Sequence, residues 1–216
     1  MNSYLSRAAL PALLALLLSA CSPAAEQPLP YYGIHTTDPQ TGDTIYHRIR
    51  DFAFIDQDSQ QVTNATFAGK AYVADFFFTS CPTICPKVKK NMLRMYEAYK
   101  DEDRLLFLSH SIDVKRDTVG RLKAYAQGLG IDDGSHRWRL VTGKRKEIYD
   151  IAYDYISTAL ENPDAPGGFD HSGYVLLIDA NGHLRAYADG TNKEEVDRLM
   201  GDIDRLLAEM DAGKKK

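Results

Sequence analysis

The sequence is poor in cysteine, carries no excess of basic residues, and has only one hydrophobic run that approaches membrane-spanning length. The formal net charge of -4 gives no electrostatic reason to bind nucleic acid, so no nucleic-acid partner is expected. The single apolar run excludes a polytopic membrane protein. No Gly-rich phosphate loop, paired-carboxylate pattern or Ser-His-Asp signature is visible. Three cysteines is an odd number, so each one needs its own explanation.

The amino terminus accounts for the first cysteine. Arg7 precedes an apolar stretch, residues 8–20, that has the length of a signal-peptide core. The stretch ends in Leu-Ser-Ala before Cys21, which resembles a bacterial lipobox, in which the cysteine is lipidated and becomes the first residue. We therefore expect residues 1–20 to be a lipoprotein signal peptide and Cys21 to anchor the chain to a membrane on the extracytoplasmic, periplasmic side. An ordinary signal peptide and an uncleaved anchor are the alternatives.

The rest of the chain predicts an α/β domain with a mixed sheet. Residues 21–45 are expected to be a lipidated tether and an irregular lead-in, 46–211 the folded domain, and 212–216 a basic tail. The apolar run 72–78 suits a strand that is buried on both faces. Further strands are expected at 47–54, 105–112 and 138–141, and helices at 86–100, 118–129, 144–155 and 193–210. Asp117 is expected to cap the helix at 118–129, and Gly130 follows its end. Residues 174–179 and 183–187 predict a hairpin around Asn181-Gly182.

The other two cysteines, Cys81 and Cys85, lie between the most apolar strand and the helix that follows it. The unpaired N–H groups and the partial positive charge of a helix start favour a thiolate over a thiol. Residues four positions apart on a helical turn can point the same way, so the pair could close a disulfide or bind one metal ion. A purely structural disulfide is the alternative.

Three segments stand out in the sequence: Thr-Ser-Cys-Pro-Thr-Ile-Cys-Pro at 79–86, Ser-Ile-Asp-Val-Lys-Arg-Asp-Thr at 111–118, and Asp-His-Ser at 170–172 before the predicted hairpin. Together they resemble the Sco/SenC family of copper-binding, thioredoxin-like proteins. The resemblance runs from about residue 52 to 207 and implies a thioredoxin-like fold, a mixed sheet flanked by helices. It also implies that Cys81, Cys85 and His171 bind copper. The implied role is to deliver copper to the binuclear centre of cytochrome c oxidase, or to reduce its thiols, with oxidase subunit II or another copper or thiol protein as partner.

The cysteine loop departs from the family at one point. Thr83 and Ile84 stand where several members carry an acidic residue, so the loop has less negative charge. Two thiolates and an imidazole form a soft site that suits Cu(I); Cu(II) could add a water or a carboxylate, and Zn(II) would also accept three protein ligands. Closing a disulfide would remove both sulfur ligands, so redox state and metal binding are expected to be coupled.

Four other polar residues have roles that the sequence predicts. Asp113, at a strand end, and Asp170, before His171, could tune the charge near the metal without binding it. Asp75 lies inside the buried strand and is expected to be hydrogen-bonded, since an unpaired buried charge is costly. His110 is expected to be a partly buried imidazole whose hydrogen bonds are satisfied.

Three alternative functions remain. They are a thiol-disulfide reductase, a thioredoxin-like peroxide-reducing enzyme, and a lipoprotein with a structural disulfide and a partner-binding role.

Overall fold

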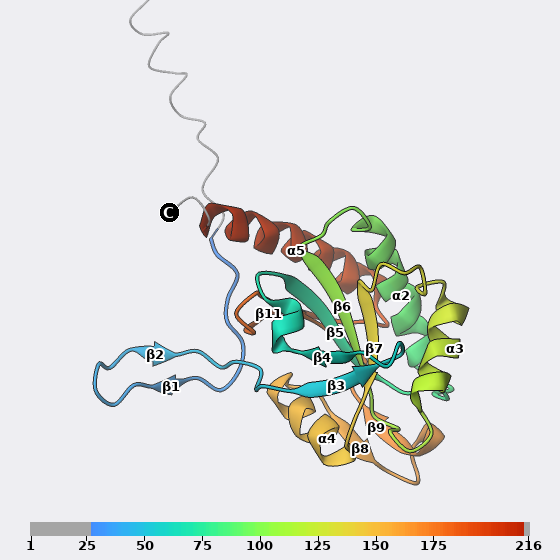
Figure 1. Ribbon diagram of the computed structural model, residues 1–216. Helices are drawn as coiled ribbons and strands as arrows, with labels where there is room; N and C mark the ends of the chain where they lie inside the picture. Colours follow the sequence, from blue (N-terminus) through green and yellow to red (C-terminus); the bar gives the residue numbers. More distant parts are fainter. Residues whose placement is uncertain (1–26, 214–216) are drawn as a thin grey trace, which may run out of the picture.

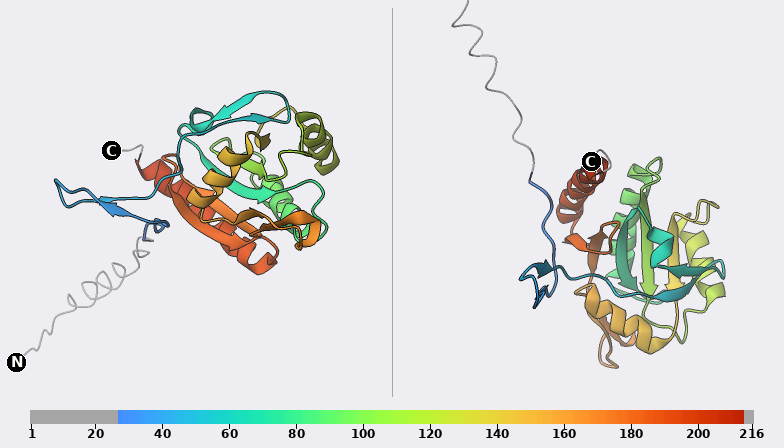
Figure 2. Two further views of the ribbon diagram at one scale, coloured as in Figure 1. Left: turned by 90° about the horizontal axis from the view of Figure 1, so that it is seen from below. Right: turned by 60° about the vertical axis from the view of Figure 1, so that its left-hand side comes forward.

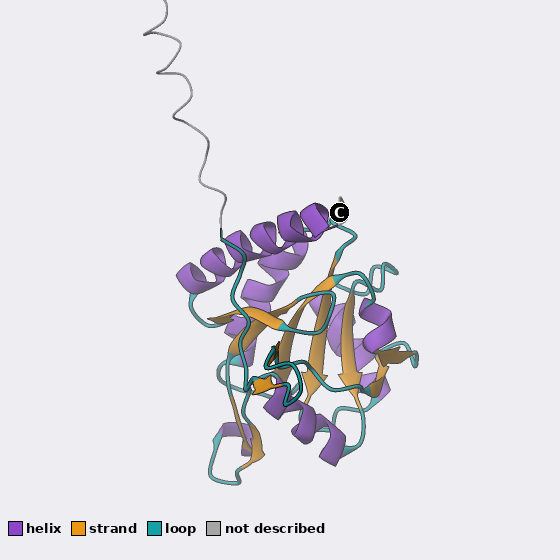
Figure 3. Ribbon diagram, turned by 90° about the vertical axis from the view of Figure 1, so that its left-hand side faces the viewer, coloured by secondary structure: helices purple, strands orange, loops and turns teal. Residues whose placement is uncertain are grey.

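A computed structural model describes residues 27–213 and shows a mixed β-sheet covered by helices on both faces (Figures 1 and 3). The main sheet has seven strands in the order β11-β10-β5-β6-β7-β3-β4. Its parallel centre consists of β5 (Ala71–Phe77), β6 (Leu105–Ser111) and β7 (Trp138–Thr142). Antiparallel strands β10 (Tyr174–Ile178) and β11 (Leu184–Asp189) extend one side, and β3 (Ala53–Asp56) and β4 (Gln61–Thr63) extend the other.

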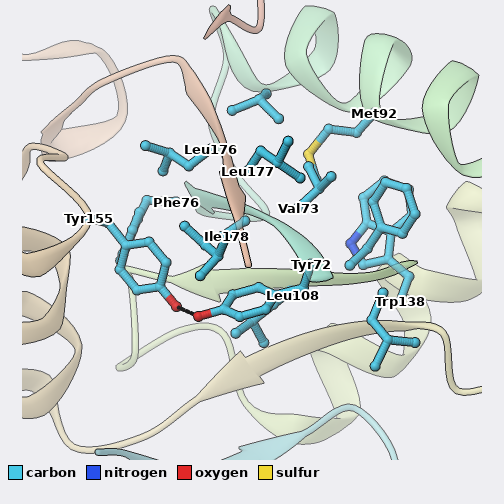
Figure 4. Close-up of a cluster of buried hydrophobic side chains, with 14 of the residues drawn as sticks. Tyr72, Val73, Phe76, Met92, Leu108, Trp138, Tyr155, Leu176, Leu177 and Ile178 are labelled. Carbon is cyan, nitrogen blue, oxygen red and sulfur yellow. Dashed lines mark hydrogen bonds between the residues drawn. The ribbon is translucent and has the colours of Figure 1, made fainter. Parts of the chain in front are cut away.

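The alternation of side chains along β5 divides the core between the two faces of the sheet. On one face, Val73, Asp75 and Phe77 point toward α2 (Cys85–Ala98), where Lys89 contacts both Asp75 and the Phe77 ring. On the other face, Tyr72 and Phe76 pack against Tyr155, which follows α4 (Arg145–Asp154). Figure 4 shows the Tyr72 and Tyr155 hydroxyls joined by a hydrogen bond of 2.9 Å inside this core.

Two helices besides α2 and α4 complete the layers. α3 (Val119–Leu129) connects β6 to β7, and its Tyr125 ring packs on Phe77. α5 (Lys193–Gly213) lies along β10 and β11 and buries one apolar stripe, which is formed by Val196, Leu199, Ile203, Leu206 and Leu207. Tyr125 of α3 and Lys89 of α2 thus both pack on Phe77, at the end of β5 from which the cysteine loop emerges.

The sequence predicted most of these elements to within a few residues. The strands at 72–78, 105–112 and 138–141, the helices and the late hairpin are all present. The first strand was placed too early, since residues 46–52 are irregular and β3 begins at Ala53. Asp117 does not cap α3: Thr118 is the N-cap residue, and its hydroxyl accepts a bond from the Arg121 N–H. Gly130 ends α3 in the left-handed conformation, as expected for a helix terminus.

Three peripheral features were not predicted. β1 (Thr36–Thr37) and β2 (Thr44–Ile45) pair into an arm that projects from the body, inside the segment expected to be irregular (Figures 1 and 2). Leu29 is buried beside the end of α5, where Glu209 accepts a hydrogen bond from its N–H. A separate hairpin is formed by β8 (Ala159–Glu161) and β9 (Phe169–His171), with the 3-10 turn η3 (Pro166–Gly168) between them; another such turn, η2 (Asn64–Phe67), follows β4.

Within residues 27–213, no helix is both long enough and apolar enough to cross a membrane. The expected signal peptide and Cys21 lie outside the described residues. The boundaries proposed for the tether, the domain and the basic tail remain predictions, although α5 continues to Gly213 and so includes the first residues of the expected tail.

Candidate metal centre

The cysteine loop joins the end of β5 to the start of α2. The Cys81 N–H donates to the Phe78 carbonyl at 3.2 Å, which closes a turn directly after the strand. Cys85 is the first residue of α2, and Pro86 is tolerated beside it because the first N–H groups of a helix have no partner within the helix. Both thiols are free and buried, with 8% and 3% of the residue exposed for Cys81 and Cys85.

His171 reaches the cysteines from the β8–β9 hairpin. It is the last residue of β9, where it pairs with Ala159 of β8. The base of the hairpin is fixed by a 2.6 Å hydrogen bond between the hydroxyls of Ser157 and Ser172 and by the bond from the Ser172 N–H to the Thr158 carbonyl. The half-buried imidazole is thus delivered to the cysteine loop by a two-stranded element that is not part of the main sheet.

The three side chains converge on one point. Nε2 of His171 lies 3.2 Å from Sγ of Cys85 and 3.7 Å from Sγ of Cys81. The three donor atoms all lie within 4.8 Å of one another, and they are the only group of three or more His, Cys, Asp or Glu residues with metal-binding geometry in the described part of the chain. The Phe78 ring packs edge-on against the imidazole of His171, and the two ring centroids are 5.2 Å apart. An apolar ring therefore lies next to this donor.

The two thiols differ strongly in acidity. The hydrogen bond from Cys85 is the largest influence on Cys81 and lowers its pKa to about 4, with further support from backbone hydrogen bonds at Thr83 and Cys85. The same shared hydrogen bond, followed by burial, raises the pKa of Cys85 far above its ordinary value. The metal-free site therefore holds one thiolate, at Cys81, and one thiol, at Cys85.

The buried carboxylate of Asp117 fixes the residues that precede Cys81. Asp117 has no exposed surface and accepts hydrogen bonds from the Thr79 N–H at 3.0 Å, the Thr79 hydroxyl at 2.6 Å and the Ser111 hydroxyl at 2.6 Å. The Nε–H of Arg121 also donates to the Thr79 hydroxyl. The segment 111–118 and the residues before Cys81 are therefore linked through one side chain, which sequence reasoning had placed at a helix cap.

A buried ion pair lies one helical turn beyond Cys85. The Lys89 ammonium donates to both carboxylate oxygens of Asp75, at 2.9 and 2.8 Å, and to the Ser109 hydroxyl at 2.7 Å. Burial lowers the pKa of Lys89, against the attraction of Asp75. The expectation that Asp75 is hydrogen-bonded is confirmed. Lys89 was missed, although a carboxylate inside an apolar strand itself implies a buried cationic partner.

Three other predicted roles have different outcomes. Asp113 accepts bonds from the N–H and the guanidinium of Arg116, and exposed Asp170 accepts one from the Asn162 side chain. Within residues 27–213, neither carboxylate bonds to Cys81, Cys85 or His171. The expectation of a satisfied, partly buried His110 was wrong, since this residue is fully buried and neither ring nitrogen has a hydrogen-bond partner in the described chain.

Known proteins resemble this chain in sequence. The sequence model of the SCO1/SenC family matches residues 40–208. An SCO2-like protein of Rickettsia conorii is 31% identical over 157 residues, which cover 69% of this chain and 74% of that protein.

Solved structures share the fold. A SCO1/SenC family lipoprotein from Bacillus anthracis is 29% identical, with a TM-score of 0.66 over 74% of this chain and 95% of its own. The structure of Bradyrhizobium japonicum ScoI with copper bound has 24% identity and a TM-score of 0.61, over 73% and 98% of the two chains. BsSco, described as a member of the Sco family of cytochrome c oxidase assembly proteins, has 23% identity and a TM-score of 0.66, over 83% and 98%. These likenesses confirm the thioredoxin-like fold.

Proposed function

Because this chain belongs to the SCO1/SenC family, we propose that it binds copper and acts in cytochrome c oxidase assembly, where it delivers copper to the binuclear copper centre or reduces the thiols of that centre. Cys81, Cys85 and His171 are the proposed copper ligands. The observation that carries the proposal is the convergence of their three donor atoms within 4.8 Å, from two elements that are far apart in the sequence.

The donor set fits copper. Thiolate sulfur is a soft ligand that selects Cu(I), and an imidazole nitrogen also suits Cu(II). Cys81 already holds a thiolate, so binding has to displace a proton only from Cys85. The buried Phe78 ring packs against His171 and gives this ligand an apolar neighbour. Zinc would accept the same three ligands, but copper precedes zinc in affinity at a given site.

The comparisons support the proposal at the level of the family. The ScoI structure from Bradyrhizobium japonicum contains copper, and BsSco is assigned to a family of cytochrome c oxidase assembly proteins. The Bacillus anthracis relative is a lipoprotein, which agrees with the lipobox-like residues before Cys21. We propose an extracytoplasmic chain, anchored to a membrane through lipidated Cys21, whose partner is oxidase subunit II or another copper or thiol protein.

Complementation tests this function. A strain that lacks the gene is supplied with the parent protein, with His171→Ala, or with His136→Ala, whose imidazole is exposed and remote from the cysteines. We expect the parent and His136→Ala to restore cytochrome c oxidase activity and the copper content of its binuclear centre, and His171→Ala to restore little of either. Normal oxidase in the strain without the gene would contradict the proposal.

The unequal thiols favour a second function, that of a thiol-disulfide reductase. Cys81 is acidic enough to attack a disulfide as a thiolate, and Cys85 is the thiol that would resolve the mixed disulfide. One cycle forms the Cys81–Cys85 disulfide as the substrate disulfide becomes two thiols. This chemistry needs no imidazole ligand, so reductase activity that survives in His171→Ala, together with restored oxidase assembly, would favour the reductase.

A further inference from the structure

The turn of the β8–β9 hairpin rests on the cysteine loop through a glycine. Gly167 has a φ of +81°, and a Cβ atom built on it would lie 2.7 and 2.8 Å from Cε2 and Cζ of Phe78 and 3.2 Å from Cδ of Pro82. Real Cβ atoms essentially never show contacts as short as the two with Phe78, and the contact with Pro82 would be unusually tight. The hairpin can therefore seat on Phe78 and Pro82 only because residue 167 has no side chain.

The same phenylalanine contacts the two ends of β9. The Phe78 ring packs on Phe169 with ring centroids 5.0 Å apart, and it stands edge-on to His171 at 5.2 Å. Phe78 is 1% exposed and is fixed at the carboxyl end of β5, three residues before Cys81. The ring is thus a fixed surface against which the turn, Phe169 and the imidazole are all set.

Outside this seat, the described chain holds the hairpin through the contacts of β8 with α4, which include the exposed ion pair of Arg145 and Glu161, and through its base. β8 and β9 form a sheet of their own and pair with no strand of the main sheet among residues 27–213. Their base is held by Ser157 and Ser172, while the turn closes on itself through the bonds from the Gly168 N–H to the Ala165 carbonyl and from the Asn162 N–H to the Gly168 carbonyl. The seat on Phe78 therefore sets how closely the strand that ends in His171 approaches the thiols.

We propose that Gly167 is a positioning residue of the copper site: its missing side chain lets the β8–β9 hairpin seat on Phe78 and Pro82 and so brings the His171 imidazole to the two cysteines. The expected effect on copper binding rests on the proposed function. A side chain at residue 167 would lift the hairpin and leave a two-thiol site that lacks its imidazole.

The neighbouring glycine supplies a matched control. Gly168 has a similar φ of +91°, so alanine costs similar backbone strain there, but nothing lies within 4 Å of its Cβ position. The test compares Gly167→Ala and Gly168→Ala in the full-length protein purified in detergent. A third variant, Gly167→Ala with Phe78→Leu, removes the two ring atoms that the new methyl group would strike, and Phe78→Leu alone is its reference.

Copper binding gives the first measurement. In Gly167→Ala we expect Cu(II) affinity to fall roughly 10- to 100-fold, the usual effect when a metal ligand loses its support. The nitrogen coupling in the Cu(II) electron paramagnetic resonance spectrum should weaken in the same variant. Cu(I) affinity, which depends on the two sulfurs, should change far less. Gly168→Ala should keep the parent spectrum, and Phe78→Leu should restore nitrogen coupling to Gly167→Ala.

Amide hydrogen exchange in the metal-free protein gives a second measurement, which does not depend on copper. We expect faster exchange in residues 159–171 of Gly167→Ala than in Gly168→Ala or the parent. Equal exchange and equal Cu(II) spectra in Gly167→Ala and the parent would overturn the proposal, as would equal effects of the two alanines. A parent that binds no copper, with exchange raised only in Gly167→Ala, would contradict the proposed function but support the seating of the hairpin.

Discussion

At the scale of single residues, the two cysteines of the site hold their protons with very different strength. The pKa of Cys81 is lowered to about 4, chiefly by the hydrogen bond from Cys85, and the pKa of Cys85 is raised. The alkylation rate of Cys81 by iodoacetamide should therefore be nearly constant above about pH 5 and fall only as the pH approaches 4. An ordinary thiol would react faster with each pH unit up to about 8.5.

The variant Cys85→Ala checks this assignment. It removes the strongest support of the Cys81 thiolate, so the alkylation profile of Cys81 should move toward that of an ordinary cysteine. Peptide-level mass spectrometry of reduced, metal-free protein distinguishes the two sites. Equal labelling of Cys81 and Cys85 in the parent across pH 5 to 8 would show that the asymmetry does not exist.

His110 is a buried residue whose ring nitrogens have no hydrogen-bond partner among the described residues. Its ring is fully buried and stacks on Phe76 with centroids 4.7 Å apart, and burial lowers its pKa to about 3. We expect His110→Phe to stabilise the fold by about 1–3 kcal/mol at neutral pH, because an unsatisfied polar group is replaced by an apolar ring of similar shape. Urea unfolding measures the difference, and a less stable variant would contradict it.

The pH dependence of this difference follows from the direction of the shift. Below the unfolded-state pKa of 6.5 the unfolded chain binds a proton at His110, whereas the folded chain does not until about pH 3. Stability that depends on the neutral imidazole is therefore lost as the pH falls through this window. The advantage of His110→Phe should grow by roughly 1.7 kcal/mol between pH 6.5 and 5, with a slope that approaches about 1.4 kcal/mol for each pH unit below the unfolded-state pKa.

At the scale of elements, the cysteine loop is joined to the β6–α3 connection through Asp117. An amide in place of this carboxylate loses an acceptor oxygen and the negative charge that faces Thr79, Ser111 and Arg121. We expect Asp117→Asn to destabilise the fold by about 1–3 kcal/mol. Asp170→Asn is the control: its carboxylate is exposed, so its effect should stay within about 0.5 kcal/mol. Equal unfolding midpoints for the two variants would contradict this role.

Elements with strong local patterns could be predicted from the sequence. β5 and β6 are buried along their whole length and appear as apolar runs, and α2 shows helical spacing directly after the cysteines. The β8–β9 hairpin could not be predicted, because its three-residue strands have no periodicity and are stabilised by contacts with Phe78. Lys89 was hidden for a related reason: it lies among exposed lysines in the sequence, and only its partner Asp75 gave a signal.

The candidate site divides in the same way. Cys81 and Cys85 stood out through their spacing and their place before a helix, which are local properties. His171 lies 86 residues beyond Cys85, so only the family resemblance pointed to it. The structure shows that the imidazole reaches the thiols, whereas the charge-tuning roles expected for Asp113 and Asp170 remain predictions, since neither carboxylate bonds to the three side chains within residues 27–213.

At the scale of the whole molecule, the metal centre follows the carboxyl end of β5, whereas the start of the described chain lies near the opposite end of that strand (Figure 1). Leu29 is bound beside the end of α5, and the same helix end contacts Arg104, next to the start of β5 and β6. The cysteines follow the other end of β5, a strand of seven residues that spans roughly 20 Å. The described chain thus enters the domain near the end of β5 that is remote from the metal centre.

The central claim is that one copper ion binds to Cys81, Cys85 and His171 together. X-ray absorption of the Cu(I)-loaded full-length protein tests it most directly, with His171→Ala measured beside the parent. We predict one copper per chain, bound by two sulfur ligands and one nitrogen ligand in the parent, and loss of the nitrogen ligand with much weaker Cu(II) binding in the variant. A variant that binds both copper states as the parent does, with an unchanged nitrogen ligand, would show that His171 does not bind the metal.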